Sequence, residues 1–140
     1  MYENTLSHVL DLLPQVEGML TKTSRIAIKA KGRILFIAPA DVVTVVAQGN
    51  YVLLRRTSGS NLLRESLSTV AEKLLPYGFV RIHRCVIINS SFVEEIHLLT
   101  TGEYVLRIKG GEEFNVSRTY KKNLHSITPL WFGTDGFRPG

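Results

Sequence analysis

Apolar and polar residues alternate with a period of two along most of this chain. From residue 25 onward, short runs rich in Val, Ile and Leu are separated by turn residues such as Gly, Pro and Asn. Runs of this kind are typical of antiparallel strands joined by tight turns. The predicted strands are residues 25–30, 33–37, 41–47, 51–56, 61–64, 79–89, 92–99, 103–109 and 112–116.

Helical spacing of apolar residues appears in three segments. Residues 1–20 predict an amphipathic extension that is broken or restarted at Pro14. Ser66 is expected to cap a second helix, which Pro76 stops. A last short helix is expected to begin near Ser117. The three expected apolar stripes are Leu6, Leu10 and Leu13; then Leu67, Val70 and Leu74; then Tyr120, Leu124 and Ile127.

The order of these elements predicts the fold class. Strands outnumber helices and show no strand–helix–strand rhythm, which indicates a mostly β fold, a β-rich α+β domain of antiparallel sheets with one or two short helices. A length of 140 residues most simply corresponds to one such domain. The expected parts are an amphipathic helical extension at 1–24, the main domain at 25–130 and a C-terminal tail at 131–140.

Positive charge is concentrated in the larger part of the chain. The whole sequence has 17 Lys and Arg against 12 Asp and Glu, a net charge of +5. Residues 1–20 hold three acids and no Lys or Arg, so residues 21–140 carry 17 bases against 9 acids, a net charge of +8. This bias indicates a polyanionic partner, and nucleic acid is favoured over a membrane surface because no basic amphipathic helix stands out.

The single cysteine and the N-terminal segment both favour a cytoplasmic protein. Cys85 cannot form an intramolecular disulfide, which suits a reducing compartment. The first twenty residues include acids and Pro14, and they lack the basic start and unbroken apolar run of a signal peptide. No stretch is long and apolar enough to span a bilayer. We therefore expect no membrane association.

The sequence offers little for catalysis or metal binding. A Cys85–His83 nucleophile would need Cys85 freed from the strand and a base aimed at it, so a packed or half-exposed cysteine is favoured. A nuclease would need paired carboxylates near the basic residues, and the adjacent Glu94 and Glu95 face opposite ways on a strand. No metal-ligand spacing links the four histidines, which are His8, His83, His97 and His125. We expect no enzyme, no cofactor and no small-molecule substrate.

A basic cluster interrupts the apolar run FVRIHRCVIIN at residues 79–89. Arg81, His83 and Arg84 stand there beside the only cysteine. An unpaired arginine in a core is destabilising by several kcal/mol. The apolar VII half is therefore expected inside the sheet, and the RIHR half at a strand entrance or in a loop facing solvent.

A second basic group follows the expected cap Ser117. Arg118, Lys121 and Lys122 lie in the first turns of the last helix, where cations oppose the helix dipole. Phosphate oxygens bind readily at a helix N-terminus, because free backbone N–H groups point outward there. A bound anion would explain these residues, and the alternative is a solvated helix face.

These residues carry a resemblance to a known family. The runs DVVTVVAQGNYVLLRR, RESLSTVAEKLLPYGFVRIHRCVIINSSFVEEI and EFNVSRTYKKNL resemble the LytTR-type DNA-binding domain of bacterial transcriptional regulators. The resemblance extends from about Ile34 to Ile127, and its strongest part is F-x-x-x-H-R-(Ser or Cys)-x-x-x-N followed about thirty residues later by V-S-R-x-Y. It implies an elongated β-rich domain that reads double-stranded DNA with loops and a strand end rather than a recognition helix.

The resemblance also implies roles for individual residues. Three places would enter successive major grooves: the loop at Asn50-Tyr51, the His83-Arg84 segment and the Ser117-Arg118 turn. The base-contact candidates are Arg84, Arg118, Asn50 and Tyr51, since an arginine fork matches the guanine acceptors. The backbone-contact candidates are His83, Ser117, Lys121, Lys122, Arg55 and Arg56. An alternative for the first loop is a left-handed turn residue at 50 followed by a packed aromatic at 51.

Two features depart from the family pattern. Cys85 stands where serine is usual, and a thiol beside the cation Arg84 leads to the hypothesis of a redox-sensing role. Family members commonly carry an input module ahead of the DNA-binding part, whereas only some 24 residues precede it here. Either the chain is a fragment of a longer regulator, or the short helical extension is the whole regulatory apparatus. We favour the extension as a dimer contact through Leu6, Leu10 and Leu13, or as a brace against the domain.

The overall prediction is a LytTR-type transcriptional regulator that binds direct-repeat DNA sites as two protomers. The alternative is a protein-interaction or RNA-binding module that uses the same basic residues on an acidic partner or on RNA.

Overall fold

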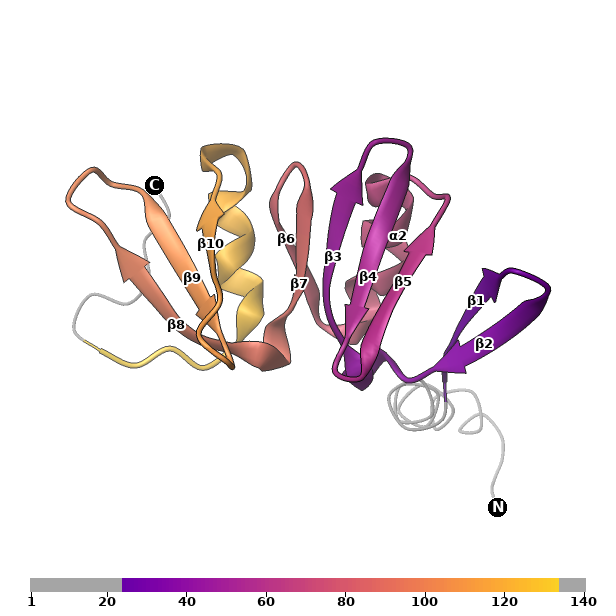
Figure 1. Ribbon diagram of the computed structural model, residues 1–140. Helices are drawn as coiled ribbons and strands as arrows, with labels where there is room; N and C mark the ends of the chain where they lie inside the picture. The colour runs from indigo at the N-terminus through magenta and orange to yellow at the C-terminus, as the bar shows by residue number, and fades with distance from the viewer. Residues whose placement is uncertain (1–23, 134–140) are drawn as a thin grey trace, which may run out of the picture. The chain divides into compact units, whose positions relative to one another are not determined.

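The computed structural model describes residues 24–133 (Figure 1). The predicted N-terminal helix and its stripe of Leu6, Leu10 and Leu13 lie outside the described residues. The chain divides into two compact units, residues 1–39 and residues 40–140, and each is described by itself. The boundaries expected at residues 24 and 130 stay a prediction.

The described residues of the first unit form an antiparallel hairpin of β1 (Ile26–Ala30) and β2 (Arg33–Ile37). Both strands confirm the prediction. Gly32 takes a φ of 67° in the turn between them, a conformation that glycine adopts without steric strain. Phe36 is exposed, and the guanidinium of Arg25 lies 5.2 Å from its ring centroid.

The second unit begins with an antiparallel five-stranded sheet of order β5-β4-β3-β7-β6. A short 3₁₀ turn, η1 (Pro39–Asp41), leads into it. The strands are β3 (Val42–Gln48), β4 (Tyr51–Arg56), β5 (Gly59–Leu63), β6 (Phe79–His83) and β7 (Val86–Asn89). The β4–β5 turn falls at Thr57-Ser58, and β5 begins at Gly59, two residues before the strand that was predicted to start at residue 61.

Helix α2 (Leu67–Leu74) connects β5 to β6. Ser66 caps it as predicted, because its side chain accepts a hydrogen bond from the Thr69 backbone N–H at 3.1 Å. The expected apolar stripe is confirmed, since Leu67, Val70 and Leu74 are the buried residues of this helix. The helix continues into a 3₁₀ turn, η2 (Leu75–Tyr77), and stops at Gly78.

A three-stranded antiparallel sheet of order β10-β9-β8 completes the second unit. Its elements are η3 (Ser90–Phe92), β8 (Val93–Leu98), β9 (Tyr104–Ile108) and β10 (Glu113–Val116). The last helix, η4 (Arg118–Ile127), begins after Ser117 as predicted but is a 3₁₀ helix. Leu124 is its buried residue, while Tyr120 and Ile127 of the expected stripe are half-buried.

A hydrophobic core joins the two sheets and η4. Ile82 and Ile88 from the larger sheet meet Leu106 and Ile108 from the smaller one, and Leu124 from η4 is fully buried among them. Burying one such side chain is worth about 1.5–3 kcal/mol. This packing holds the ends of β6, β7 and β10 in a fixed arrangement, which matters for the loops that they carry.

Residues 79–89 form two strands rather than the single strand that was expected. The chain turns at Arg84-Cys85 and returns as β7. Side-chain hydrogen bonds stabilise this turn in place of glycine or proline: the Cys85 N–H donates to Nδ1 of His83 at 3.0 Å. The expected division holds only in part: Ile87 and Ile88 are buried and Arg84 is exposed, as predicted. The rest of the RIHR half is wrong as a solvent-facing loop, because Arg81 and His83 lie half-buried in β6 and Ile82 between them is fully buried.

Candidate nucleic-acid interface

Two backbone hydrogen bonds bring three loops of the second unit to one edge. The Ala47 N–H donates to the Cys85 carbonyl at 2.9 Å, so the end of β3 lies beside the β6–β7 turn. The Ser117 N–H donates to the Ile82 carbonyl at 2.9 Å, so the start of η4 lies beside the end of β6. We call residues 48–51, 83–85 and 117–122 the loop edge, and Figure 1 shows the β3–β4 turn, the β6–β7 turn and the start of η4 along the top of the view.

The first part of the loop edge is the β3–β4 turn. Gly49 takes a φ of 61°, and Asn50 beside it is exposed. The left-handed residue is therefore Gly49, and the alternative that Asn50 fills this role is wrong. Tyr51 is 39% exposed and forms no part of the buried core, so its ring is open to a partner.

Arg64 belongs beside this turn, although sequence reasoning missed it. Its guanidinium lies 5.9 Å from the Tyr51 ring centroid, within cation–π range. The β4–β5 register pairs Arg56 with Gly59 and Val52 with Leu63, and one further step places Tyr51 opposite Arg64. The length of the β4–β5 turn is the signal that could have identified Arg64. A turn centred one residue later would place a different residue opposite Tyr51.

The second part of the loop edge is the β6–β7 turn. The Arg84 side chain is exposed, and His83 and Cys85 are half-buried. His83 accepts the Cys85 N–H through Nδ1, so in the neutral ring the hydrogen is carried by Nε2. His83 thus stabilises the turn from inside, and only its other ring nitrogen remains for a further contact.

The third part is the start of η4. Ser117 stands at the N-cap position, but its hydroxyl makes no capping hydrogen bond. Arg118 and Lys122 are exposed. Lys121 is engaged within the protein, because its Nζ donates to the Gly102 carbonyl at 3.2 Å and lies 4.6 Å from the Tyr104 ring centroid.

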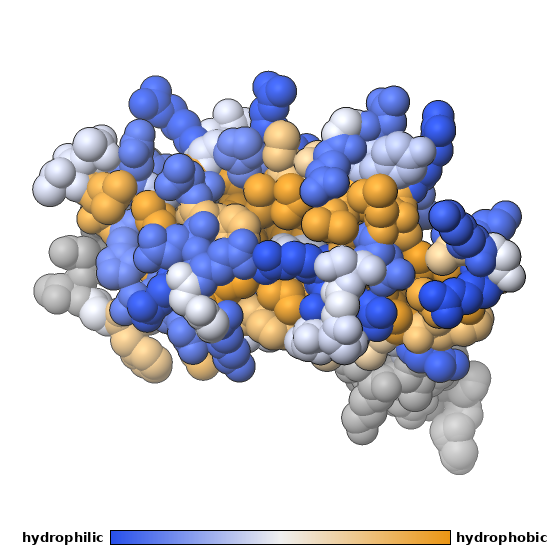
Figure 2. All heavy atoms as spheres, viewed as in Figure 1, coloured by the Kyte–Doolittle hydropathy of each residue, from blue (hydrophilic) through white to orange (hydrophobic). Residues whose placement is uncertain are grey.

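Arg84 and Arg118 share a further property. Within residues 24–133, neither side chain has an ion-pair or hydrogen-bond partner. Fixed cations without a carboxylate partner produce a positive local potential. Figure 2 shows hydrophilic side chains projecting along the upper edge, with apolar residues gathered below them.

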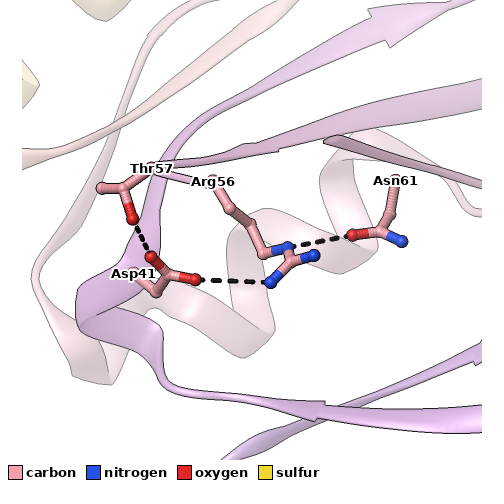
Figure 3. Close-up of polar contacts among 4 residues, drawn as sticks. All are labelled: Asp41, Arg56, Thr57 and Asn61. Carbon is pink, nitrogen blue, oxygen red and sulfur yellow. Dashed lines mark hydrogen bonds and ion pairs between the residues drawn. The ribbon is translucent and has the colours of Figure 1, made fainter. Parts of the chain in front are cut away.

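Arg55 and Arg56 lie at the other end of β4. The strand begins with Tyr51 at the loop edge, and five steps along an antiparallel strand span about 17 Å. Arg56 donates to Oδ1 of Asn61 at 3.1 Å and is 3.4 Å from Oδ2 of Asp41. Figure 3 shows this network, in which Thr57 also binds Asp41.

Arg55 has a carboxylate partner of its own. Both of its terminal nitrogens bind Glu112, one of them at 3.1 Å. The structure therefore does not bring Arg55 and Arg56 together with the other predicted backbone contacts. Their ion pairs give them a role within the fold, and we leave them out of the proposed interface.

No metal-binding group of three or more His, Cys, Asp or Glu side chains occurs in residues 24–133. Over the same range, no helix is long and apolar enough to cross a membrane. What the loop edge offers chemically is two free guanidinium forks, which suit guanine acceptors or phosphate, and an exposed ammonium group at Lys122.

Comparison with known proteins adds independent evidence. A family model described as the LytTr DNA-binding domain matches residues 32–128, more than half of the chain. A solved LytTr DNA-binding domain from Bacillus cereus has a TM-score of 0.63 and 23% identity, and the match covers 75% of this chain and 96% of that one. That similarity supports the fold.

Two curated relatives illustrate the sequence similarity. The sensory transduction protein LytT of Bacillus subtilis is 25% identical over 103 residues, which are 74% of this chain and 43% of that protein. The positive alginate biosynthesis regulatory protein of Pseudomonas aeruginosa is 30% identical over 118 residues, which are 81% of this chain and 46% of that protein. The chain spans less than half of the length of these relatives.

Proposed function

This chain belongs to the LytTr DNA-binding domain family, and from that membership we propose that it regulates transcription by binding specific double-stranded DNA through the loop edge. The observation that carries the proposal is the common placement of Arg84 and Arg118. Both are exposed and unpaired among the described residues, and the Ser117–Ile82 backbone bond keeps their segments together. Within residues 24–133, neither side chain makes an ion pair or hydrogen bond that would stabilise the fold.

The proposal divides the work between base and backbone contacts. Arg84 and Arg118 enter major grooves and donate to the O6 and N7 acceptors of guanine, and each such pair contributes about 1–3 kcal/mol of discrimination. Asn50 and Tyr51 contact base edges from the β3–β4 turn. The phosphate backbone is held by Lys122, the Ser117 hydroxyl, Nε2 of His83 and, after release of its internal contacts, Lys121.

Two protomers on a direct repeat extend the proposal. One loop edge offers few base contacts, so a single copy would recognise a short sequence. Two copies on adjacent half-sites double the number of base pairs that are read and raise the affinity by effective concentration. The repeat orientation comes from the family resemblance, and a recovered binding site would test it.

The experiment is selection of bound sequences from a random duplex library, followed by affinity measurements at two salt concentrations. We expect a motif with two similarly oriented halves, tight binding to it, and binding to scrambled duplex that is about a thousandfold weaker or more. Equal affinity for scrambled duplex, single-stranded DNA and RNA would contradict the proposal. That result would favour a module that recognises polyanions in general.

A further inference from the structure

Arg81 lies in the middle of β6, directly below the turn that carries Arg84. Its Nη2 donates to the Arg84 carbonyl at 2.6 Å, and its Nε is 3.4 Å from the His83 carbonyl. The side chain thus holds two successive carbonyl groups of the turn. This arrangement restrains the backbone from which the Arg84 side chain extends.

The same guanidinium contacts two other elements. Its Nη1 donates to Oγ of Ser68 in α2 at 3.1 Å. Its central carbon lies 5.2 Å from the ring centroid of Tyr120 in η4, two residues after Arg118. From the same helix, Asn123 donates through Nδ2 to the Arg81 carbonyl at 2.9 Å. One residue therefore connects the β6–β7 turn, α2 and the beginning of η4.

These contacts leave little of Arg81 for DNA. All three guanidinium nitrogens have acceptors inside the protein, the group stacks on Tyr120, and the residue is half-buried. Arg84 and Arg118 are the opposite case, since both are exposed. The structure thus separates an internal arginine, Arg81, from two external ones.

We propose that Arg81 is a positioning residue that sets DNA sequence specificity by fixing Arg84 relative to Arg118, without touching DNA itself. The inference rests on the proposed function, since it requires that Arg84 and Arg118 read bases. A bidentate arginine–guanine contact tolerates little displacement, so two such contacts also require a fixed separation. A planar guanidinium with several donors can hold two carbonyls, a hydroxyl and a ring at once, whereas a lysine ammonium cannot.

The test is a double-mutant cycle on the selected DNA site. Arg81→Lys keeps the charge and removes the fork, and Arg84→Ala removes the proposed base contact. We expect Arg81→Lys to lower the ratio of cognate to scrambled affinity about tenfold. Scrambled-duplex affinity and the salt dependence should stay unchanged. In the Arg84→Ala background, Arg81→Lys should lower the ratio by less than about threefold, since its effect passes partly through Arg84.

Two further variants separate this role from simpler ones. Arg107 lies on β9 and pairs with Glu95 at 3.0 Å. Arg107→Lys removes a guanidinium fork at this other place in the domain and should leave the ratio of cognate to scrambled affinity unchanged. Arg81→Met should leave the salt slope of scrambled binding unchanged, whereas loss of a phosphate contact would reduce it by about 0.9. A thermal melt of each variant gives the temperature range in which that variant is fully folded, and binding is measured within this range.

The outcomes distinguish the two levels of the argument. If Arg84→Ala lowers the ratio but Arg81→Lys has no effect, or the same effect in both backgrounds, the positioning role is overturned and the proposed function stands. If Arg84→Ala itself leaves the ratio unchanged, base reading by Arg84 is overturned together with the role of Arg81. A reduced salt slope in Arg81→Met assigns Arg81 to phosphate and also overturns the inference.

Discussion

The two ends of the five-stranded sheet both carry arginines, but in contrasting surroundings. At the loop edge, Arg84 is exposed and has no carboxylate partner among the described residues. At the other end of β4, Arg55 binds Glu112 and Arg56 binds Asp41 and Asn61. The comparison teaches that basic residues on one sheet differ in availability because of where the acids lie. Among the residues that the structure describes, Arg55 and Arg56 are paired with acids and Arg84 is not.

Energetics support the same distinction. The Arg55–Glu112 pair is about a third exposed or more on both sides, and such surface pairs contribute about 0–1 kcal/mol. Asp41 and Arg56 are less exposed, at 28% and 22%, and they belong to a network with Thr57 and Asn61. The far end is therefore expected to act on stability, and the loop edge on binding.

The largest expected effect comes from breaking the loop edge at Arg84. Arg84→Ala should lower the preference for the cognate duplex by about 1–3 kcal/mol, roughly 5- to 150-fold, because one guanidinium–guanine contact is lost. Its melting temperature should match that of the parent, since the Arg84 side chain is exposed and makes no hydrogen bond, ion pair or ring contact within residues 24–133. Competition binding with cognate and scrambled duplexes measures the first quantity and a thermal melt the second.

The next effect concerns the opposite end. Asp41→Ala should reduce the free energy of unfolding by about 1–3 kcal/mol, because Arg56 and Thr57 lose a part-buried acceptor. DNA affinity should be unchanged at a temperature where the variant is fully folded. Denaturant titration provides the stability value. A drop in cognate preference comparable with that of Arg84→Ala would erase the contrast between the two ends.

The fold was predictable from the sequence because its signals are local. Period-two alternation identified the strands, and Ser66 identified the start of α2. The turn at Arg84-Cys85 was missed because it contains neither glycine nor proline. Hydrogen bonds from Arg81 and to His83 stabilise it instead, and such contacts become visible only when the strand is folded back.

The candidate site was predictable only in part, for a different physical reason. Exposure of Arg84 and Arg118 followed from the composition of their segments. The pairing of Arg55 and Arg56 could not be foreseen, because their carboxylate partners come from 57 and 15 positions away in the chain. The engagement of Lys121 by Gly102 likewise depends on a loop of the other sheet. Long-range partners decide which cations remain free.

A smaller effect is expected at Lys122, and it sharpens the comparison by salt dependence. Lys122→Ala should weaken binding to cognate and scrambled duplexes alike, and it should reduce the slope of log affinity against log salt by about 0.9. The affinity ratio should stay at the parental value, because phosphate contacts carry no sequence information. A change in the ratio with an unchanged slope would assign Lys122 to a base instead.

The smallest effect is expected from Arg55→Ala, the matched control at the far end. The substitution also removes one positive charge, so a general charge effect would appear as the same slope change that is expected for Lys122→Ala. If charge matters only at the loop edge, the slope and the affinity ratio should both remain parental. The free energy of unfolding should fall by about 1 kcal/mol or less, since the lost partner Glu112 is solvent-exposed. Parallel salt titrations of the two variants decide the point, because equal slopes would show that DNA senses the net charge of the domain and not a particular edge.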